Sequence, residues 1–580
     1  MILQALTEYY RTLEAAGKIS APGWAQVNVS FALCINEKGD LEQLLNVQTE
    51  QLRGKKLVLA PQLMCLPSPV KKTSGKKSNF LFENSSYLLG LDENGVSKRT
   101  IECFKVGRML HESILKDTES EAAKALLEFF RRWDPEAAMS HPALADHLDE
   151  LKDGGNLVFR YRGSYIHEDP MIRAAWEESY NSQGDGPEMV CLVTGKKEPV
   201  ENIHPSIKNV QGAQSSGAAL VSFNSPAACS YGKEQNYNAP TGKFAAFAYT
   251  TALNYLLADR EHVYRVGDTT VVCWARSGQS MYQTLFGGAF FDGPIPYDEN
   301  DLRGLVRRLC RGDSFLFENE RLEADMEFYV LGLAPNAARL SVRFFLRNSF
   351  GNFLRNAIAH QDRLEIVHPG YEKDEDMPLW KLLGETVNQK STDKSPTPNM
   401  AGAVLRSILT DTPYPATMLN AVTLRIRAER ELTGPRWRRA AIIKAYYLKN
   451  IHSEVPKEVL TVSLNPDSTN IPYILGRLFS LLEAVQDAAN PGINATIKDK
   501  YFNSASATPA RVFPVLINLA QKHMRKLKEG QRVFYDKQLT ELLGKLEDSY
   551  PDHLSLPQQG SFQLGYYHQT QARYIKKEEN

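Results

Sequence analysis

Residues 390–398 read KSTDKSPTP, and this stretch separates two regions of different character. Serine, threonine, lysine and proline are typical of a linker, because they punctuate regular structure and bury little apolar surface. Before it, short apolar runs bounded by turn residues alternate with amphipathic segments. After it, strand-like alternation largely ceases, and apolar residues recur at helical spacing in 474–485 and 512–527. The sequence therefore predicts the α+β class, with mixed N-terminal and middle α+β regions, a helical insert and a C-terminal helical bundle.

A chain of 580 residues exceeds what one core usually supports, so several domains are expected. Residues 121–132 and 245–257 have helical periodicity, whereas the strand-like runs are 27–33, 157–159, 189–193, 269–274 and 327–333. These patterns predict five segments: an N-terminal α+β region with a basic loop (1–104), a helical insert (105–155), a middle α+β domain (156–390), the linker (391–400) and the helical bundle (401–580).

Composition narrows the class of protein. Hydrophobic residues make up 43% of the chain, enough for packed cores. No run of about 18 apolar residues is present to cross a bilayer, and residues 1–8 lack a secretory pattern, so we expect a cytoplasmic protein without membrane contact. The seven cysteines are scattered singly, which indicates reduced thiols. Cys191, His204 and Cys229 match no zinc spacing, so no metal or other cofactor is predicted.

The net charge is zero, but the charges are segregated. Residues 401–580 hold 24 Lys and Arg against 17 Asp and Glu, and the rest of the chain holds 44 against 51. Within the basic part, Glu429 and Glu431 are the local acids in a run of cations: Arg425, Arg427, Arg430, Arg436, Arg438, Arg439, Lys444 and Lys449. Such a run can neutralise phosphates and release counterions. A solvated helix face is the alternative interpretation.

A second basic stretch, residues 70–79, reads VKKTSGKKSN. Lys71, Lys72, Lys76 and Lys77 surround one glycine, and an exposed loop of this charge can follow a phosphate backbone. Ser78 and Asn79 add hydrogen-bonding groups. The spacing is not that of a Walker A motif. A disordered solvated loop remains the alternative.

Small, amide and hydroxyl side chains crowd residues 211–240, a composition that suits contact with a polar polymer. The first candidates are Gln211, Gln214, Ser215 and Ser216, between the glycines 212 and 217 that allow close backbone approach. The second candidates are Lys233, Gln235, Asn236 and Asn238. The alternative is a loop whose amides satisfy buried backbone groups.

Motifs that carry catalysis are not found. The sequence holds no GxSxG, HExxH or GxGxxG pattern and no clustered carboxylates of the DxD kind. Asp259, Arg260, Glu261 and His262 are consecutive, and consecutive helix residues diverge by about 100°, so we expect a helix end rather than a convergent site. His360 and Asp362 are likewise not predicted to form a catalytic site. The chain is not predicted to be an enzyme.

Several motifs, taken in their order and spacing, resemble one family over essentially the full length. They include CLVTG at 191–195, LVSFN at 220–224, SYGKEQ at 230–235, NAP at 238–240 and LAPN at 333–336 with Arg339 and Ser341–Arg343. Further matches are MILQAL at 1–6, IHP at 203–205, ALN at 252–254, VGD at 266–268 before Trp274, LGRLF at 475–479 and NATI at 494–497. The chain thus resembles the large subunit of the type I-C CRISPR Cascade complex.

That resemblance implies a non-catalytic DNA-recognition subunit of a crRNA-guided antiviral complex. In the family, the N-terminal portion reads the protospacer-adjacent motif (PAM), helps to open the duplex into an R-loop, and presents the complex to a separate helicase-nuclease. The implied partners are double-stranded target DNA, the displaced single strand, crRNA-bearing backbone subunits, the crRNA-handle-binding subunit and small subunits. A metal-dependent nuclease and a purely structural scaffold of a ribonucleoprotein are the alternatives.

The resemblance also implies that the C-terminal bundle acts as the small subunits do and can be made separately from an internal start. Met418 is the nearest methionine upstream of the terminal bundle, and a start closer to residues 455–465 would use a non-methionine codon at Val455, Val459 or Val462. The basic and amide-rich segments then receive roles. Lys71, Lys72, Lys76 and Lys77 are expected to clamp duplex phosphates while Ser78 or Asn79 reaches a groove edge. Residues 211–217 form a wedge or base-reading segment, with 233–238 as second candidates. Arg425, Arg427, Arg436, Arg438 and Arg439 guide the displaced strand.

Overall fold

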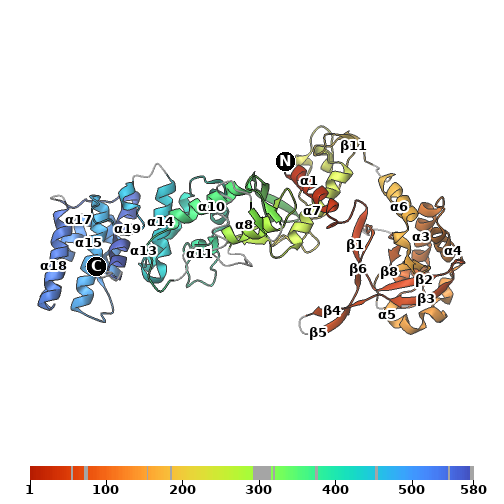
Figure 1. The fold of residues 1–580 in the computed structure, drawn as a ribbon, viewed down its shortest axis with the longest axis horizontal. Helices are drawn as coiled ribbons and strands as arrows, with labels where there is room; N and C mark the ends of the chain where they lie inside the picture. Colours follow the sequence, from red (N-terminus) through yellow and green to blue (C-terminus); the bar gives the residue numbers. More distant parts are fainter. Residues whose placement is uncertain are drawn as a thin grey trace. The chain divides into compact units, whose positions relative to one another are not determined.

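The computed structural model describes residues 1–53, 56–70, 76–152, 154–182, 186–291, 315–317, 320–372, 377–450, 455–546 and 549–574. The chain divides into two compact units: unit 1 is Met1–Pro205 with Val221–Leu253, and unit 2 is Ser206–Leu220 with Asn254–Asn580. Small sheets occur in both, and helices dominate the C-terminal half (Figure 1). The predicted α+β class is confirmed. No helix in the described ranges has the length and apolarity needed to span a membrane.

A five-stranded sheet forms the centre of the first part of unit 1. Its order is β3-β2-β8-β7 with β9 beside β8, and β2 and β8 are parallel neighbours. The strands are β2 (Phe31–Ile35), β3 (Leu41–Asn46), β7 (Phe82–Glu83), β8 (Leu157–Tyr161) and β9 (Ser164–Tyr165). The helices that follow β7 are α2 (Ser85–Leu88), α3 (Lys98–Leu115), α4 (Glu121–Arg132), α5 (Leu148–Lys152) and, after β9, α6 (Pro170–Ser182). Phe129 and Phe130 of α4 pack on Phe159 of β8, so these helices share the core of the sheet.

A long two-stranded ribbon leaves this sheet. Strand β1 (Trp24–Val29) pairs antiparallel with β6 (Gln62–Pro67), and β4 (Thr49–Arg53) pairs with β5 (Lys56–Ala60) further along (Figure 1). The predicted strand 27–33 is therefore broken at Ser30, whose N–H donates to Asn156 O at 2.9 Å. The rest of unit 1 contains α1 (Ile2–Ala15), β10 (Glu188–Val190), β11 (Lys197–Pro199) and the start of α7 (Lys243–Ala258). Tyr10 of α1 contacts Phe244 and Phe247 of α7 edge to face.

Unit 2 begins with a four-stranded antiparallel sheet of order β12-β13-β16-β17. Its strands are β12 (Val263–Val266), β13 (Thr269–Ala275), β16 (Glu327–Asn336) and β17 (Arg339–Ser349), and a small hairpin joins β14 (Phe315–Phe317) to β15 (Glu320–Leu322). Helices α8 (Met281–Phe291), α10 (Phe350–Leu364) and α11 (Leu379–Gly384) pack with the sheet. Strand β13 is buried along its whole length, which explains its continuous apolar run.

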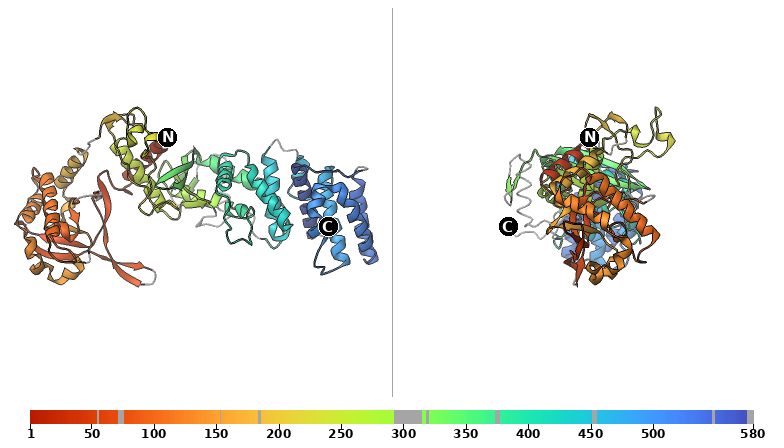
Figure 2. Two further views of the ribbon diagram at one scale, coloured as in Figure 1. Left: turned by 180° about the vertical axis from the view of Figure 1, so that it is seen from behind. Right: turned by 90° about the vertical axis from the view of Figure 1, so that its right-hand side faces the viewer.

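Helices form the remainder of unit 2: α12 (Pro398–Thr410), α13 (Ala416–Glu429), α14 (Arg438–Lys449), α15 (Ile471–Ala489), α16 (Ile497–Ala507), α17 (Pro509–Met524), α18 (Glu529–Gly544) and α19 (Leu556–Ala572). Figures 1 and 2 show α15, α17, α18 and α19 side by side, as their contacts require. One hydrophobic cluster extends from Val271 in β13 through Val404 in α12 to Tyr566 in α19. The KSTDKSPTP stretch therefore leads directly into a helix of the same core.

Candidate nucleic-acid interface

Asn79 closes the base of the basic loop in unit 1. Its Oδ1 accepts a hydrogen bond from Val70 N at 2.8 Å, and its own N–H donates to Glu83 Oε2 at 3.2 Å. Only 4% of Ser78 and 6% of Asn79 is exposed. Contact of either residue with a DNA groove stays a prediction, and in this conformation both residues are buried: Asn79 joins the two ends of the loop, and Ser78 Oγ donates to Asn79 O at 3.0 Å.

The anchor continues to His111. Leu81 adopts a left-handed conformation (φ 65°) and donates its N–H to His111 Nε2 at 2.9 Å. Burial lowers the pKa of His111 to about 4, so the ring is neutral, with Nδ1 donating to Gly107 O. Lys76 and Lys77 directly precede this base in the chain. Lys76 pairs with Glu102 and Lys77 is exposed, whereas Lys71 and Lys72 lie outside the described residues.

Asn238 holds the second candidate segment of unit 1. Its Oδ1 accepts from Ser230 N at 2.9 Å, and its Nδ2 donates to Lys233 O at 3.1 Å and Gln235 O at 2.9 Å. Asn236 is buried. Contact of Asn236 and Asn238 with DNA stays a prediction: in this conformation the Asn236 side chain is buried, and the half-buried Asn238 amide holds the loop. Lys233 and Gln235 are exposed.

The tip of this loop presents a residue that the sequence reasoning missed. Tyr231 is 99% exposed and has a φ of 55°, a conformation uncommon for a bulky side chain, and it stands between Ser230 and Gly232. The Asn238 hydrogen bonds fix the backbone on both sides of it. An exposed ring beside Lys233 can stack on a base while the cation meets a phosphate. The SYGK sequence indicates an aromatic residue in a turn, but the sequence prediction considered only the amide, hydroxyl and lysine side chains of this segment.

Residues 211–217 lie in unit 2, whereas residues 233–238 lie in unit 1. Gln211 N donates to Thr270 Oγ1 at 3.2 Å, and Gly217 N donates to Gln214 O at 2.9 Å. Ala219 then forms a bridge with Arg339 at the start of β17. The side chains of Gln211, Gln214, Ser215 and Ser216 are exposed on this turn. They stay candidates for contact with nucleic acid.

The arginine run of α13 and α14 is largely engaged within the protein. Arg439 has no exposed surface; it contacts Glu385 Oε2 at 3.0 Å, Glu429, and Glu431 O at 2.9 Å. Arg438 pairs with Glu372 at 2.9 Å, and Arg436 lies 3.6 Å from Glu385 and 3.7 Å from Glu431. Guidance of a DNA strand by Arg436, Arg438 and Arg439 stays a prediction, and in this structure their guanidinium groups are engaged in ion pairs within the protein. Arg425, 3.8 Å from Glu429, is also mostly buried.

Exposed cations of the helical region gather instead around the turn between α17 and α18. We call this the 522–537 basic turn: Lys522, Arg525, Lys526, Lys528, Arg532 and Lys537. All six are exposed, and within the described ranges none forms an ion pair; Lys526 Nζ donates to Asn490 Oδ1 at 2.9 Å. Glu529 and Asp536 are the acids of this stretch. Arg427 of the earlier run is also exposed and donates to Gln559 Oε1 at 2.7 Å.

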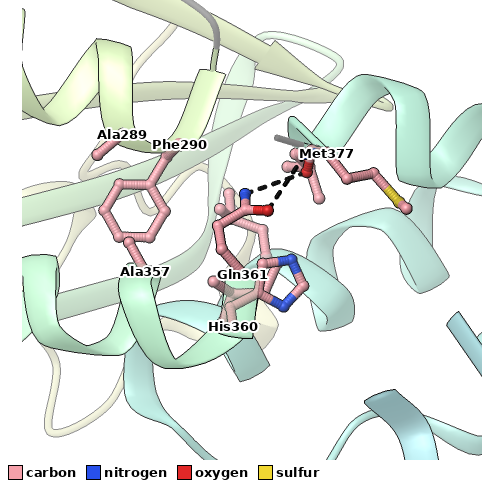
Figure 3. A pocket seen from close by; sticks show the side chains of 9 residues that line it. Ala289, Phe290, Ala357, His360, Gln361 and Met377 are labelled. Carbon is pink, nitrogen blue, oxygen red and sulfur yellow. Dashed lines mark hydrogen bonds between the residues drawn. The ribbon is translucent and has the colours of Figure 1, made fainter. Parts of the chain in front are cut away.

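The histidines singled out in the sequence are structural or are held in local networks. His360 is buried, its Nδ1 lies 2.5 Å from Tyr414 Oη, and burial lowers its pKa to about 3. It lines a cavity of about 10 Å³ beside Gln361, which exchanges two hydrogen bonds with Met377 (Figure 3). Such a space admits at most one water molecule. No group of three metal-ligating side chains occurs among the described residues.

Asp259 and His262 converge, contrary to the sequence expectation. Asp259 Oδ2 lies 2.7 Å from His262 Nδ1, and His262 Nε2 lies 2.9 Å from Thr284 Oγ1. Helix α7 ends at Ala258, as expected for a helix end, but the turn that follows does not have helical spacing, so the 100° argument fails there. The three groups join the end of α7 to α8.

Comparison with known proteins identifies the family. A family model described as CRISPR-associated protein (Cas_Csd1) matches residues 6–574. The chain belongs to this family. The match confirms the resemblance drawn from the sequence motifs and makes the chain a CRISPR-associated protein of the Cascade type over nearly its whole length. A search of curated proteins gave no match. In a Csd1-family protein, the exposed cations, amides and Tyr231 described above are candidate contacts for nucleic acid.

Proposed function

We propose that this Csd1-family chain is the DNA-recognition subunit of a type I-C Cascade complex and breaks no covalent bond itself. In this role it reads the PAM, helps to open the duplex, stabilises the R-loop and supports recruitment of the helicase-nuclease. Family membership supports the complex. The observation that carries the proposal is the Tyr231 tip, a fully exposed aromatic ring on a loop that Asn238 holds by three hydrogen bonds.

Such a subunit needs only a few contacts with the DNA. Guide pairing supplies most of the sequence specificity, so the protein needs to grip phosphates and read only a few base edges beside the target. In unit 1, Lys76 and Lys77 stand at the rigid base of the basic loop, and Lys71 and Lys72 belong to the same role by sequence. Tyr231 stacks where the duplex opens, while Lys233 and Gln235 contact its backbone or base edges. The exposed 211–216 turn supplies further polar contacts from unit 2.

The displaced strand needs only non-specific electrostatics. The 522–537 basic turn and Arg427 supply it, in place of the arginines that the fold uses internally. The remaining partners are crRNA-bearing backbone subunits, the crRNA-handle-binding subunit and small subunits, in the cytoplasm. A separately translated product that starts near Val455–Val462 contains α15 to α19 and serves as a small subunit.

A band-shift series with the assembled complex tests this function. Target duplexes differ only in the three base pairs that flank the guide-matched region. We expect affinity to change at least tenfold between triplets, and Tyr231→Ala to weaken the preferred duplex about tenfold, since stacking is worth about 1–3 kcal/mol per base. A duplex with a preformed bubble should lose affinity by a similar factor, because the stacked base is unpaired in both complexes, and Tyr231→Phe should behave as wild type. Tyr574→Ala, at another exposed tyrosine, is the matched control.

The competing functions give different results in the same assays. A scaffold assembles normally and binds all triplets equally, which would refute DNA recognition. A nuclease cleaves DNA when the purified chain is incubated with DNA and magnesium. Unchanged binding of both the duplex and the bubble in Tyr231→Ala would remove the stacking role from the tip while leaving the flanking-motif test independent.

A further inference from the structure

Two pockets adjoin in unit 2, where the β12–β13 turn meets the start of α12. The first has a volume of about 490 Å³ and is lined by Asp268, Thr269, Arg343, Asn399 and Arg406 among others. The second, of about 450 Å³, is lined by Arg265, Phe291, Trp380 and Lys394 among others. Each falls within the roughly 300–1,000 Å³ of ligand pockets. We call the pair the 265–406 groove.

One backbone contact lies between residues that line the two pockets. Gly267 has a φ of 62°, and a Cβ placed on it would lie 2.9 Å from Cα of Pro398. The turn and the helix start therefore touch through their backbones, and residues on each side of this contact line different pockets. Gly267 and Pro396 line the second pocket, and Asp268 and Pro398 line the first. The two pockets therefore flank one backbone contact, which an extended ligand would cross to occupy both.

The second pocket has an aromatic wall. Trp380 is 58% exposed although it belongs to α11, whose other apolar residues face the core. Tyr264 and Phe291 line the same pocket and stack with ring centroids 4.2 Å apart and planes inclined by 6°. Lys381 Nζ lies 5.5 Å from the Trp380 ring centroid. An indole held on a helix at a pocket wall is a surface on which a flat ring can stack.

Cations line both pockets. Arg265 and Lys394 belong to the second pocket, and Arg343 and Arg406 to the first. Arg343 pairs with Asp268 at 2.5 Å, and among the described residues Asp268 is the one carboxylate that lines the groove. Arg265, Lys394 and Arg406 are exposed, and no hydrogen bond or ion pair to their side chains is formed within the described ranges. The groove therefore has an excess of positive charge with three uncommitted cations.

We propose that the 265–406 groove binds single-stranded nucleic acid, with a base stacked on Trp380 and phosphates on Arg265, Lys394 and Arg406. Alternation of a stacking surface with cations is what unpaired nucleic acid needs, because every base has a π face and every linkage a negative charge. A peptide partner fits less well, since three cations and one paired acid would demand a strongly acidic segment. The inference rests on the proposed function only in that the chain meets nucleic acid.

The test uses the full chain, without the other subunits, and fluorescent 12-mers of oligo(dT) and oligo(U). We expect Trp380→Ala to weaken binding at least fivefold and Trp380→Phe to stay within about twofold, since phenylalanine keeps a stacking face. Arg406→Gln should lower the salt slope of binding by about 0.7, the value for one phosphate of a single strand. Photocrosslinking of iodo-substituted oligonucleotides should map to the peptide that contains Trp380.

Matched controls lie outside the groove. Lys390→Gln removes an exposed cation from the same segment, and Tyr574→Ala removes an exposed ring; both should bind as wild type. Tighter binding of oligo(dT) assigns the groove to DNA, and tighter binding of oligo(U) assigns it to the guide; either supports the proposal. Unchanged affinity in both Trp380→Ala and Arg406→Gln overturns it. So does unchanged affinity combined with a failure of complex assembly, which would make the groove a protein-docking site. None of these results depends on flanking-motif recognition by the assembled complex.

Discussion

Arg439 is a buried charged residue with a structural role. Its guanidinium is fully buried and contacts Glu385, itself buried, and Glu429. Removing one partner of such a network leaves carboxylates without compensation in the interior, which costs about 3–5 kcal/mol. We therefore expect Arg439→Gln to lower the free energy of unfolding by about 3 kcal/mol, measured by urea denaturation, and to weaken DNA binding only as far as it unfolds the chain.

Arg532→Gln is the reciprocal control, because Arg532 is exposed on the 522–537 basic turn. Its free energy of unfolding should stay within about 0.5 kcal/mol of wild type, as for surface substitutions in general. A stable Arg439→Gln protein with a specific loss of strand binding would contradict the structural role and restore the role expected from the sequence.

At the scale of elements, α15 and α19 approach each other through reciprocal glycines. A Cβ on Gly476 would lie 1.9 Å from Phe562 O, and a Cβ on Gly565 would lie 2.0 Å from Tyr473 O. Neither distance allows a side chain, so the helices must move apart to admit one. Overpacking of this kind costs about 1–3 kcal/mol, occasionally more. We expect Gly476→Ala to destabilise the chain by about 3 kcal/mol in thermal or urea unfolding followed by circular dichroism.

Gly530 gives the matched test within α18. No atom lies within 4 Å of a Cβ built there, so Gly530→Ala should be neutral or stabilise by up to about 1 kcal/mol. Equal effects at Gly476 and Gly530 would mean that the α15–α19 crossing is looser than the structure shows.

The 522–537 basic turn is an element whose charge should appear in binding rather than in stability. Replacing Lys522, Arg525, Lys528 and Arg532 with Gln should lower the salt slope for single-stranded DNA by up to about 0.7 for each phosphate that the variant no longer neutralises, with the unfolding midpoint unchanged. An unaltered slope in fluorescence anisotropy titrations over a series of salt concentrations would exclude the turn from the strand path.

The hydrophobic periodicity of the sequence predicted the helices and strands more accurately than sequence composition predicted the candidate nucleic-acid contacts. The 121–132 pattern became α4, 245–257 became α7, and 269–274 and 327–333 became β13 and β16, because burial of one face imposes a regular spacing of apolar residues. The prediction of site residues missed interaction partners that come from distant parts of the sequence. Glu372 and Glu385, which engage Arg438 and Arg439, lie 66 and 54 positions earlier, and no local count of acids finds them. Likewise, the sequence indicates that Asn79 and Asn238 are exposed and available to contact bases, whereas both side chains accept hydrogen bonds from backbone N–H groups.

For the molecule as a whole, burial of histidines links stability to pH. Burial lowers the pKa of His111, His167 and His204 to about 4 and of His360 and His568 to about 3. In three of them Nδ1 contacts a tyrosine hydroxyl: His204 with Tyr249, His360 with Tyr414 and His568 with Tyr473. Each ring is thus neutral in the native state and titrates near pH 6.5 when unfolded.

Below about pH 6.5 the unfolded chain binds these protons and the native chain does not, so stability falls as the pH falls toward about 4. At about pH 5 each such histidine costs about 2 kcal/mol relative to about pH 7.5. We expect the urea midpoint to drop steeply between these two pH values at constant ionic strength. His568→Asn should be less stable at the higher pH but have a shallower pH dependence, because one titrating group is gone. His553→Asn, at an exposed histidine, should keep the wild-type slope. A midpoint that stays flat across this range would mean that the rings ionise in the folded protein.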